Sequence, residues 1–309
     1  MQFRDPEKKN ISNRIINIAI LAVSIGITII IIALLTGKGL QEKIKSKTTA
    51  FNGHISITPF ENNESQISVL PFKDDFNLKK TIKKNKGINI INSVAFDGVI
   101  LKNKNDFEGG LFKGVNSDYT WNIIKDFLVE GKYPSIDKNE ISNEIILSKS
   151  LADRLSIELG NTIDLYFQNL NNKNLPYRSR FKIVGLFSSG FPEIDNNLIY
   201  GDIDQIRRVK KWDKNMIGGY EIFIDNIYNS DQVSERIYNQ LPPNLDSLSI
   251  IKRFKSIFQW IALFDFNILI ILIIVIIVSL VNLSTALLIL IFEKSKMISI
   301  LKTMGLNNT

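Results

Sequence analysis

Residues 266 to 292 read FNILIILIIVIIVSLVNLSTALLILIF, a run of 27 residues without a charged side chain. A helix needs about 20 mostly apolar residues to cross the hydrocarbon core of a bilayer. The run therefore predicts a membrane-spanning helix, which we place at residues 261–292. Trp260 and Phe264 lie at its start, where aromatic side chains commonly anchor a span at the membrane interface.

The span leads directly into Glu293-Lys-Ser-Lys-Met-Ile-Ser-Ile-Leu-Lys-Thr-Met-Gly305. Apolar residues recur there at helical spacing, and Lys296 and Lys302 lie off their face. The apolar positions are Met297, Ile300, Leu301 and Met304. Gly305 is typical of the residue that follows a helix C-terminus. The pattern predicts a short amphipathic helix at the membrane surface, which either binds a partner or merely caps the span.

A second uncharged run, Ile15 to Leu35, lies near the N-terminus. It is long for the core of a signal peptide, and no small-residue cleavage pattern follows it. We therefore predict an uncleaved transmembrane helix at residues 15–36.

Both predicted spans carry small or polar residues near helical spacing, which allow close helix packing. In the first span these are Ala19, Ala22, Gly26 and Ala33. In the second they are Ser279, Asn282 and Ala286, together with Leu283. We interpret both sets as packing faces, rather than as parts of a substrate path.

The segment between the spans, residues 37–260, has the patterns of a mixed α and β domain. Alternating apolar residues predict strands at 54–58, 94–101, 109–115, 144–148, 162–168, 180–187, 220–224 and 248–251. Capping residues and glycine stops predict helices at 74–85, 149–159, 202–212 and 231–241. The order suggests that residues 54–115 and 218–251 share one sheet, with the mainly-strand stretch 117–200 inserted as a second lobe. The expected fold class is an α+β membrane protein with two transmembrane helices flanking this domain.

The composition excludes several classes of function. The chain has no cysteine, so it has neither disulfides nor thiol chemistry. Its formal charge of +7 comes from scattered lysines, several of which flank the apolar runs. Such lysines favour contact with membrane lipid over binding to nucleic acid.

No catalytic or cofactor pattern is present. The single histidine, His54, we interpret as a solvated strand residue rather than as part of a catalytic triad. The chain has no phosphate-binding loop for ATP. Glu193 and Asp195 lie among turn-forming residues, and two carboxylates do not make a calcium loop. We expect no enzymatic activity, no cofactor and no bound metal.

The segment after the second span resembles the coupling helix of type VII ABC transporter permeases. This superfamily contains the lipoprotein-release (LolC/LolE-type) and MacB-type permeases, whose pattern here is roughly E-(K/R)-x-(K/R)-E-I-G-I-L-(K/R)-A-(L/M)-G. The matching residues are Glu293, Lys294, Lys296, Ile298, Ile300, Leu301, Lys302, Met304 and Gly305. The pattern's acid, glycine and alanine are replaced by Met297, Ser299 and Thr303.

Several phrases in the central domain resemble the same family. They are Leu111-Phe-Lys-Gly-Val115, Ile145-Ile-Leu-Ser-Lys-Ser-Leu-Ala152, Leu159-Gly-Asn-Thr162 and Phe181-Lys-Ile-Val-Gly-Leu-Phe187. Together with the two spans, their order extends the resemblance over most of the chain.

The resemblance implies a permease subunit in the cell inner membrane. Residues 1–14 would lie in the cytoplasm, residues 37–260 would form a periplasmic MacB-like core domain with a porter-like lobe and an inserted lobe, and residues 293–309 would contain the coupling helix. A separate ABC ATPase subunit would bind that helix through Glu293, Lys296, Ile298, Leu301, Lys302, Met304 and Gly305. Further implied partners are a second permease subunit, identical or different, a lipoprotein cargo and a periplasmic carrier.

Other functions fit parts of the same pattern. A MacB-like efflux permease and an FtsX-like mechanotransmission permease share the family's architecture. A two-span signalling receptor is an alternative of a different class, but a receptor would continue into heptad-patterned helices after the second span. A ligand-binding membrane anchor is a third alternative. Family permeases have two more spans after the coupling helix, so we expect that the chain is truncated there.

Overall fold

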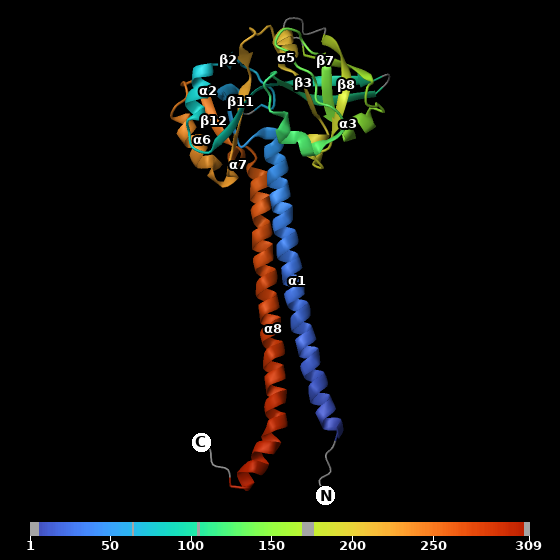
Figure 1. Ribbon diagram of the computed structural model, residues 1–309, viewed down its shortest axis with the longest axis vertical. Coiled ribbons are helices and arrows are strands. Elements are labelled where there is room, and N and C mark those ends of the chain that lie inside the picture. Colours follow the sequence, from blue (N-terminus) through green and yellow to red (C-terminus); the bar gives the residue numbers. More distant parts are fainter. Residues whose placement is uncertain (1–5, 64, 104–105, 169–175, 306–309) are drawn as a thin grey trace. The chain divides into compact units, whose positions relative to one another are not determined.

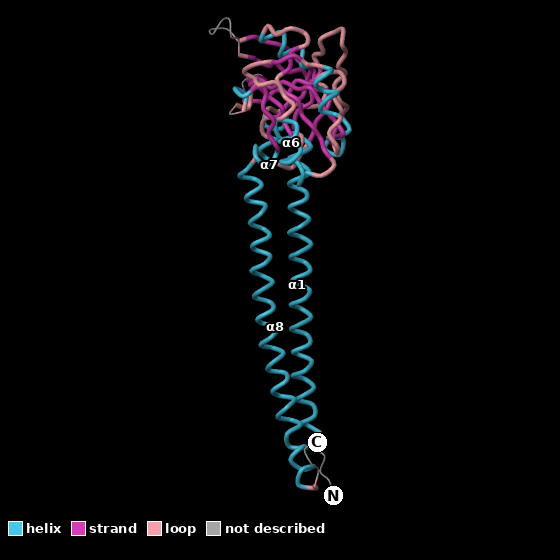
Figure 2. Tube along the Cα trace, turned by 90° about the vertical axis from the view of Figure 1, so that its left-hand side faces the viewer, coloured by secondary structure: helices cyan, strands magenta, loops and turns pink. Residues whose placement is uncertain are grey.

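The computed structural model describes residues 6–63, 65–103, 106–168 and 176–305 (Figure 1). The chain forms two compact units. One comprises Met1–Ile44 with Ser256–Thr309, and the other is Lys45–Lys255. Every described strand belongs to the second unit, whereas the first consists of two long helical segments (Figure 2).

Helix α1 (Pro6–Asn52) contains the whole predicted first span and continues well beyond residue 36. The helix thus extends past residue 37, where the central domain is predicted to begin. The helix ends at Gly53, which has a φ of +73°. A glycine readily adopts this left-handed conformation after a helix.

Helix α8 (Lys255–Thr303) contains both the predicted second span and the amphipathic segment. The predicted amphipathic segment is helical and continues the span, because the helix runs through residues 292 and 293 without a break. The predicted glycine stop is confirmed, since Gly305 has a φ of +94°. Figure 1 shows the last turns of α8 (red) bending away from the line of the rest of the helix.

One half of the α/β unit is a four-stranded antiparallel sheet in the order β12-β1-β11-β3. Its elements are β1 (Ile55–Pro59), α2 (Phe76–Lys83), β3 (Ile88–Asn103), β11 (Gly219–Ile224), α6 (Ser230–Tyr238) and β12 (Leu245–Ser249). The arrangement is two interleaved split βαβ units, one from each end of the domain. The early and late stretches of the sequence thus lie in one sheet, as their patterns suggest.

The middle of the chain completes a closed ring of six strands, in which each pairs with the next. They are β3, β4 (Asp106–Val115), β9 (Leu198–Asp202), β6 (Glu144–Ser148), β8 (Tyr177–Phe187) and β7 (Thr162–Phe167), and β7 pairs again with β3. Strand β3 closes the ring because its first half pairs with β11 and its second half with β7. The strands within residues 117–200 therefore share hydrogen bonds with β3 and β4 and continue the same sheet.

Shorter elements complete the unit. They are η1 (Phe60–Asn62), β2 (Phe72–Lys73), η2 (Trp121–Phe127), β5 (Leu128–Gly131), α3 (Lys149–Arg154), α4 (Pro192–Asp195), α5 (Ile203–Lys210), β10 (Met216–Ile217), η3 (Ile227–Asn229) and α7 (Ile250–Arg253). Side chains cap the starts of α3 and α5, since Ser148 accepts a hydrogen bond from Leu151 N and Asp202 accepts one from Asp204 N. The strand predicted at 248–251 ends at Ser249, whose hydroxyl instead caps α7.

The last turn of α1 lies inside the core of the α/β unit. The Phe51 ring is buried, with ring centroids 5.2 Å from Phe127, 5.4 Å from Phe187 and 6.3 Å from Tyr200. Thr48, Thr49 and Ala50 are buried as well. The helix is therefore a structural part of this unit from about Lys45 onward.

Candidate functional site

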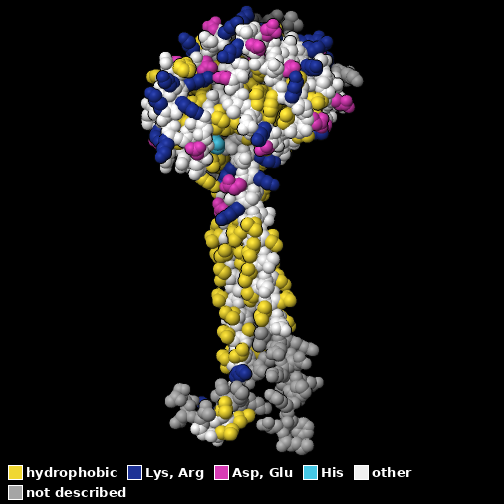
Figure 3. Space-filling view, in the orientation of Figure 1, with side chains coloured by type: hydrophobic (Ala, Val, Ile, Leu, Met, Phe, Trp, Pro, Cys, Tyr) yellow, Lys and Arg dark blue, Asp and Glu magenta, His cyan; other side chains and the backbone are white. Residues whose placement is uncertain are grey.

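Two helical segments are long and apolar enough to cross a membrane. They are Ile20–Asn52 in α1 and Lys255–Phe292 in α8. Apolar side chains cover much of the surface of these helices in Figure 3. An exposed apolar surface of this extent is stable in lipid rather than in water.

The covered positions of α1 and α8 form a seam, in which successive residues are three or four apart. On α1 the seam contains Ala22, Gly26, Ile30, Ala33, Gly37, Gln41 and Ile44. On α8 it contains Ile261, Phe264, Ile268, Leu272, Val275, Ser279, Asn282, Ala286 and Ile289. This alternation of three and four is the repeat of two helices that pack along their length.

The structure places most of the predicted packing residues in this seam. Ala22, Gly26, Ala33, Ser279, Asn282 and Ala286 are all half-buried. Leu283, predicted for the same face, is 54% exposed and lies outside the seam. The side chain of Ala19 lies outside the part of the chain whose side chains are described.

Glycines bring the two backbones close together. A Cβ atom at Gly26 would lie 3.3 Å from Val275 Cγ1, and one at Gly37 would lie 2.7 Å from Ile268 Cδ1. Small residues at such positions allow two helices to approach closely in a membrane.

A polar contact lies near one end of the seam. The buried amide of Gln41 donates to Asp265 Oδ1 at 2.9 Å and to the carbonyl of Ile261 at 3.3 Å. This contact joins α1 to the first turns of α8. No pattern in the sequence singles out Gln41, because it lies beyond the apolar run.

The predicted ATPase-binding residues lie on the last turns of α8 and, for Met304 and Gly305, directly after its end. Among those with described side chains, Leu301, Lys302 and Met304 are exposed, with Met304 at 78%. Ile300, on the predicted apolar face, is exposed too. The side chains of Glu293, Lys296 and Ile298 lie outside the described set, although their backbone is helical. The segment thus presents apolar side chains in a helical conformation.

A buried charge cluster in the α/β unit was missed by sequence reasoning. The ammonium group of Lys113 has no exposed surface, lies 2.7 Å from both carboxylate oxygens of Glu221, and donates to the carbonyl of Phe51 at 2.8 Å. Burial lowers the pKa of Lys113, and the Glu221 carboxylate opposes that shift. A lysine within the apolar strand Leu111–Val115 was the available signal, because it can be buried only with a partner.

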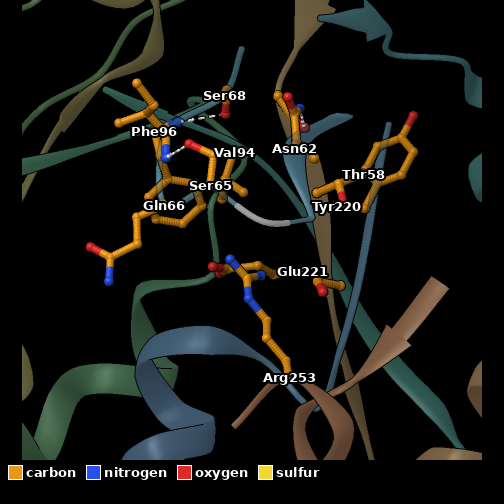
Figure 4. A pocket seen from close by; sticks show the side chains of 14 residues that line it. Thr58, Asn62, Ser65, Gln66, Ser68, Val94, Phe96, Tyr220, Glu221 and Arg253 are labelled. Carbon is orange, nitrogen blue, oxygen red and sulfur yellow. Dashed lines mark hydrogen bonds between the residues drawn. The ribbon is translucent and has the colours of Figure 1, made fainter. Parts of the chain in front are cut away.

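Arg253, at the end of α7, extends this cluster. Figure 4 shows its side chain directed toward Glu221 in a small cavity that Ser68 and Phe96 also line. Burial lowers the pKa of Arg253, whereas the Glu221 charge raises it. The cavity measures about 20 Å³, which holds one water molecule but no larger ligand.

The remaining candidate residues have structural roles. His54 directly precedes β1 and is partly buried, so the interpretation of a solvated strand residue is wrong. Its Nδ1 accepts a hydrogen bond from Ile224 N, and burial lowers its pKa to about 4. Asp195 accepts hydrogen bonds from Ser189 N and Gly190 N. Within the described residues, no group of three acidic, histidine or cysteine side chains could hold a metal ion.

Comparison with known proteins gives the chain its family. The model of the MacB-like periplasmic core domain matches residues 18–240. The lipoprotein-releasing system transmembrane protein LolC of Neisseria meningitidis serogroup B is 23% identical over 94% of this chain and 69% of its own length. LolC of Buchnera aphidicola subsp. Schizaphis graminum is 27% identical over 98% of this chain and 73% of its own length.

Among solved structures, the periplasmic region of MacB from Actinobacillus actinomycetemcomitans aligns with a TM-score of 0.42 and 13% identity, covering 66% of this chain and 91% of that one. The extracellular domain of the transporter YknZ from Gram-positive bacteria aligns with the same score and 12% identity, covering 63% of this chain and 99% of that one. The family match spans most of the α/β unit and part of α1, and the LolC relatives extend through α8. The chain therefore belongs to the family of MacB-like periplasmic core domain proteins, within the LolC/MacB-type superfamily of ABC transporter permeases.

Proposed function

We propose that this protein is the permease subunit of an ABC complex that releases lipoproteins from the cell inner membrane. A separate ATPase subunit would bind and hydrolyse ATP, and this chain would pass the resulting movement to its α/β unit. The choice of lipoprotein release over efflux rests on the two LolC relatives, which align with almost the whole chain. Family membership favours a permease over a two-span signalling receptor.

The observation that carries the proposal is the exposed apolar end of α8. Ile300, Leu301 and Met304 lie within two turns and are all exposed to solvent. Apolar side chains beyond a span lower the free energy of a complex when a partner covers them. We infer that these residues, with Ile298, form the apolar centre of the ATPase contact. Glu293, Lys296 and Lys302 would form its polar rim, and Gly305 would end the helix there.

The length of α8 suggests how movement would be transmitted. The helix is unbroken over 49 residues and contains neither glycine nor proline. Sharp helix kinks arise mainly at those residues. A displacement of residues 293–303 would therefore pass through the bend at the end of α8 into the span, because the helix is continuous, and the seam would carry α1 with it.

In this proposal the α/β unit lies in the periplasm and residues 1–14 lie in the cytoplasm. A second permease subunit, identical or different, would complete the membrane part, and a lipoprotein would lie among the transmembrane helices before a periplasmic carrier receives it. The chain itself would hydrolyse no ATP and need no cofactor.

A detergent pull-down with the cognate ATPase subunit tests the contact. The variant carries Ile298→Glu and Leu301→Glu, which place two carboxylates in the proposed apolar interface. Burying unpaired charge costs several kcal/mol, so a micromolar complex should be lost. The matched control carries Ser295→Glu and Ser299→Glu, which add the same charge on the side of the helix away from Leu301 and Met304 and should leave binding intact.

Equal loss of ATPase binding in both variants would indicate a general effect of added charge. It would contradict the assignment of the contact to Ile298 and Leu301.

The proposed release of lipoproteins needs a second measurement. Proteoliposomes that contain the complex should release an embedded lipoprotein to a soluble carrier when ATP is added. ATPase binding without any such release would leave the permease assignment in place and refute the proposed cargo.

A further inference from the structure

The surface around α2 concentrates positive charge. Its side chains are Phe76, Lys79, Lys80, Lys83, Lys84 and Ile91, which together we call the α2 basic surface. The sequence contains no acidic residue from Phe76 to Phe96. Lysine and arginine side chains gather over this part of the α/β unit in Figure 3, where α2 lies in Figure 1.

Most of this charge is not neutralised within the protein. Lys79 pairs with Asp74 at 3.0 Å. In the part of the chain that the structure describes, Lys80, Lys83 and Lys84 form no ion pair, and Lys83 donates only to the carbonyl of Asn89. The nearby acids are already engaged, since Asp74 also accepts from Tyr220 and Asp75 caps α2 by accepting from Asn77 N.

The α2 basic surface is a shallow, widely open hollow with apolar side chains at its centre. It surrounds a hollow of about 530 Å³, and Phe76 and Ile91 lie against it. Phe76 is 76% exposed, because α2 packs on the core through Ile82 and Leu78 instead. An exposed aromatic side chain that the core does not use is typical of a binding anchor.

We propose that the α2 basic surface binds an acidic segment of a partner protein, which inserts an apolar side chain beside Phe76. Carboxylates on both sides of that side chain would pair with Lys80, Lys83 and Lys84. The hollow favours such a peptide over a lipid surface, because a row of headgroups would meet the lysines but would have no side chain to fill the concavity. The proposal goes beyond the permease function and does not depend on ATPase binding.

Fluorescence anisotropy with the full chain in detergent tests the proposal. The probe is a labelled peptide, Glu-Asp-Glu-Leu-Glu-Asp-Glu, measured beside one with alanine in place of leucine. The triple variant Lys80→Gln/Lys83→Gln/Lys84→Gln should weaken binding about tenfold at low salt, since each exposed ion pair contributes a small factor. The control triple Lys125→Gln/Lys138→Gln/Lys182→Gln removes the same charge from exposed positions elsewhere and should bind like the parent.

The apolar part is tested by a double-mutant cycle. Phe76→Ala and the change of leucine to alanine in the peptide should each weaken binding several-fold, and the two effects should not add, because both remove the same contact. Equal weakening by the two lysine triples, or additive effects in the cycle, would overturn the proposal. Preferential binding of vesicles containing phosphatidylglycerol, lost in the α2 triple and unaffected by Phe76→Ala, would replace the protein partner with a lipid surface.

Discussion

At the scale of single residues, the buried ion pair between Lys113 and Glu221 has a high desolvation cost, because both charges are removed from water. Each charge is stabilised inside the domain by the other, together with the carbonyl of Phe51 for Lys113 and the charge of Arg253 for Glu221. The rings of Phe96, Tyr119 and Tyr200 surround the ammonium group at 5.0 to 5.7 Å. Favourable cation–π contacts add to its stabilisation. The pair therefore holds the end of α1, strand β4 and strand β11 together.

Replacing Lys113 alone should be strongly destabilising. Lys113→Met leaves the Glu221 carboxylate buried without its partner, at a cost of about 3–5 kcal/mol, which lowers the Tm by about 10 °C. The double variant Lys113→Met/Glu221→Gln should recover part of that loss, because it removes the unpaired carboxylate but also the acid beside Arg253. Differential scanning fluorimetry of the full chain measures both. Lys149→Met, which breaks an exposed pair with Glu130, is the control and should leave the Tm unchanged. A single variant as stable as the parent would contradict the role of the pair.

At the scale of helices and strands, local patterns predicted most elements, whereas long-range pairing could not be predicted. The alternation in Val94–Leu101 and Gly109–Val115 predicts two strands, and the structure pairs them antiparallel. The ring closure depends on β7 meeting β3 across more than 50 residues of sequence, which no local pattern encodes. Helix α1 was predicted too short because Gly37, Gly39 and several lysines interrupt the apolar run, although the buried Gln41 and Ile44 continue its helical spacing.

The packing of α1 against α8 can be tested by cross-linking without background, because the chain has no cysteine. Gly26→Cys/Val275→Cys places two thiols at a point of close approach, where a Cβ atom at Gly26 would lie 3.3 Å from Val275 Cγ1. Oxidation in native membranes should protect both thiols from PEG-maleimide. The control pair Ile27→Cys/Ile274→Cys lies on exposed positions and should stay reactive. A product of twice the mass in place of the internal cross-link would assign Gly26 to a contact between subunits.

At the scale of the whole molecule, the boundary between the two units falls inside α1 and not at the end of the apolar run. Residues from Lys45 to Asn52 belong to the α/β unit, and Phe51 fills the space between Phe127 and Phe187. A fragment of residues 45–255 should therefore fold on its own, whereas a fragment of residues 53–255 should not reach the same stability.

The shorter fragment lacks the Phe51 ring and the carbonyl that accepts from Lys113. Losing a buried phenylalanine side chain alone costs about 3–5 kcal/mol, and the missing acceptor adds to that cost. Thermal unfolding and dye binding of the two fragments measure the difference. The unfolding temperature of the fragment 45–255 with Phe51→Ala should lie between those of the two fragments, because this change removes the ring and keeps the carbonyl. If the two fragments unfold at the same temperature, residues 45–52 of α1 contribute nothing to the stability of the α/β unit, and the assignment of these residues to its core is wrong.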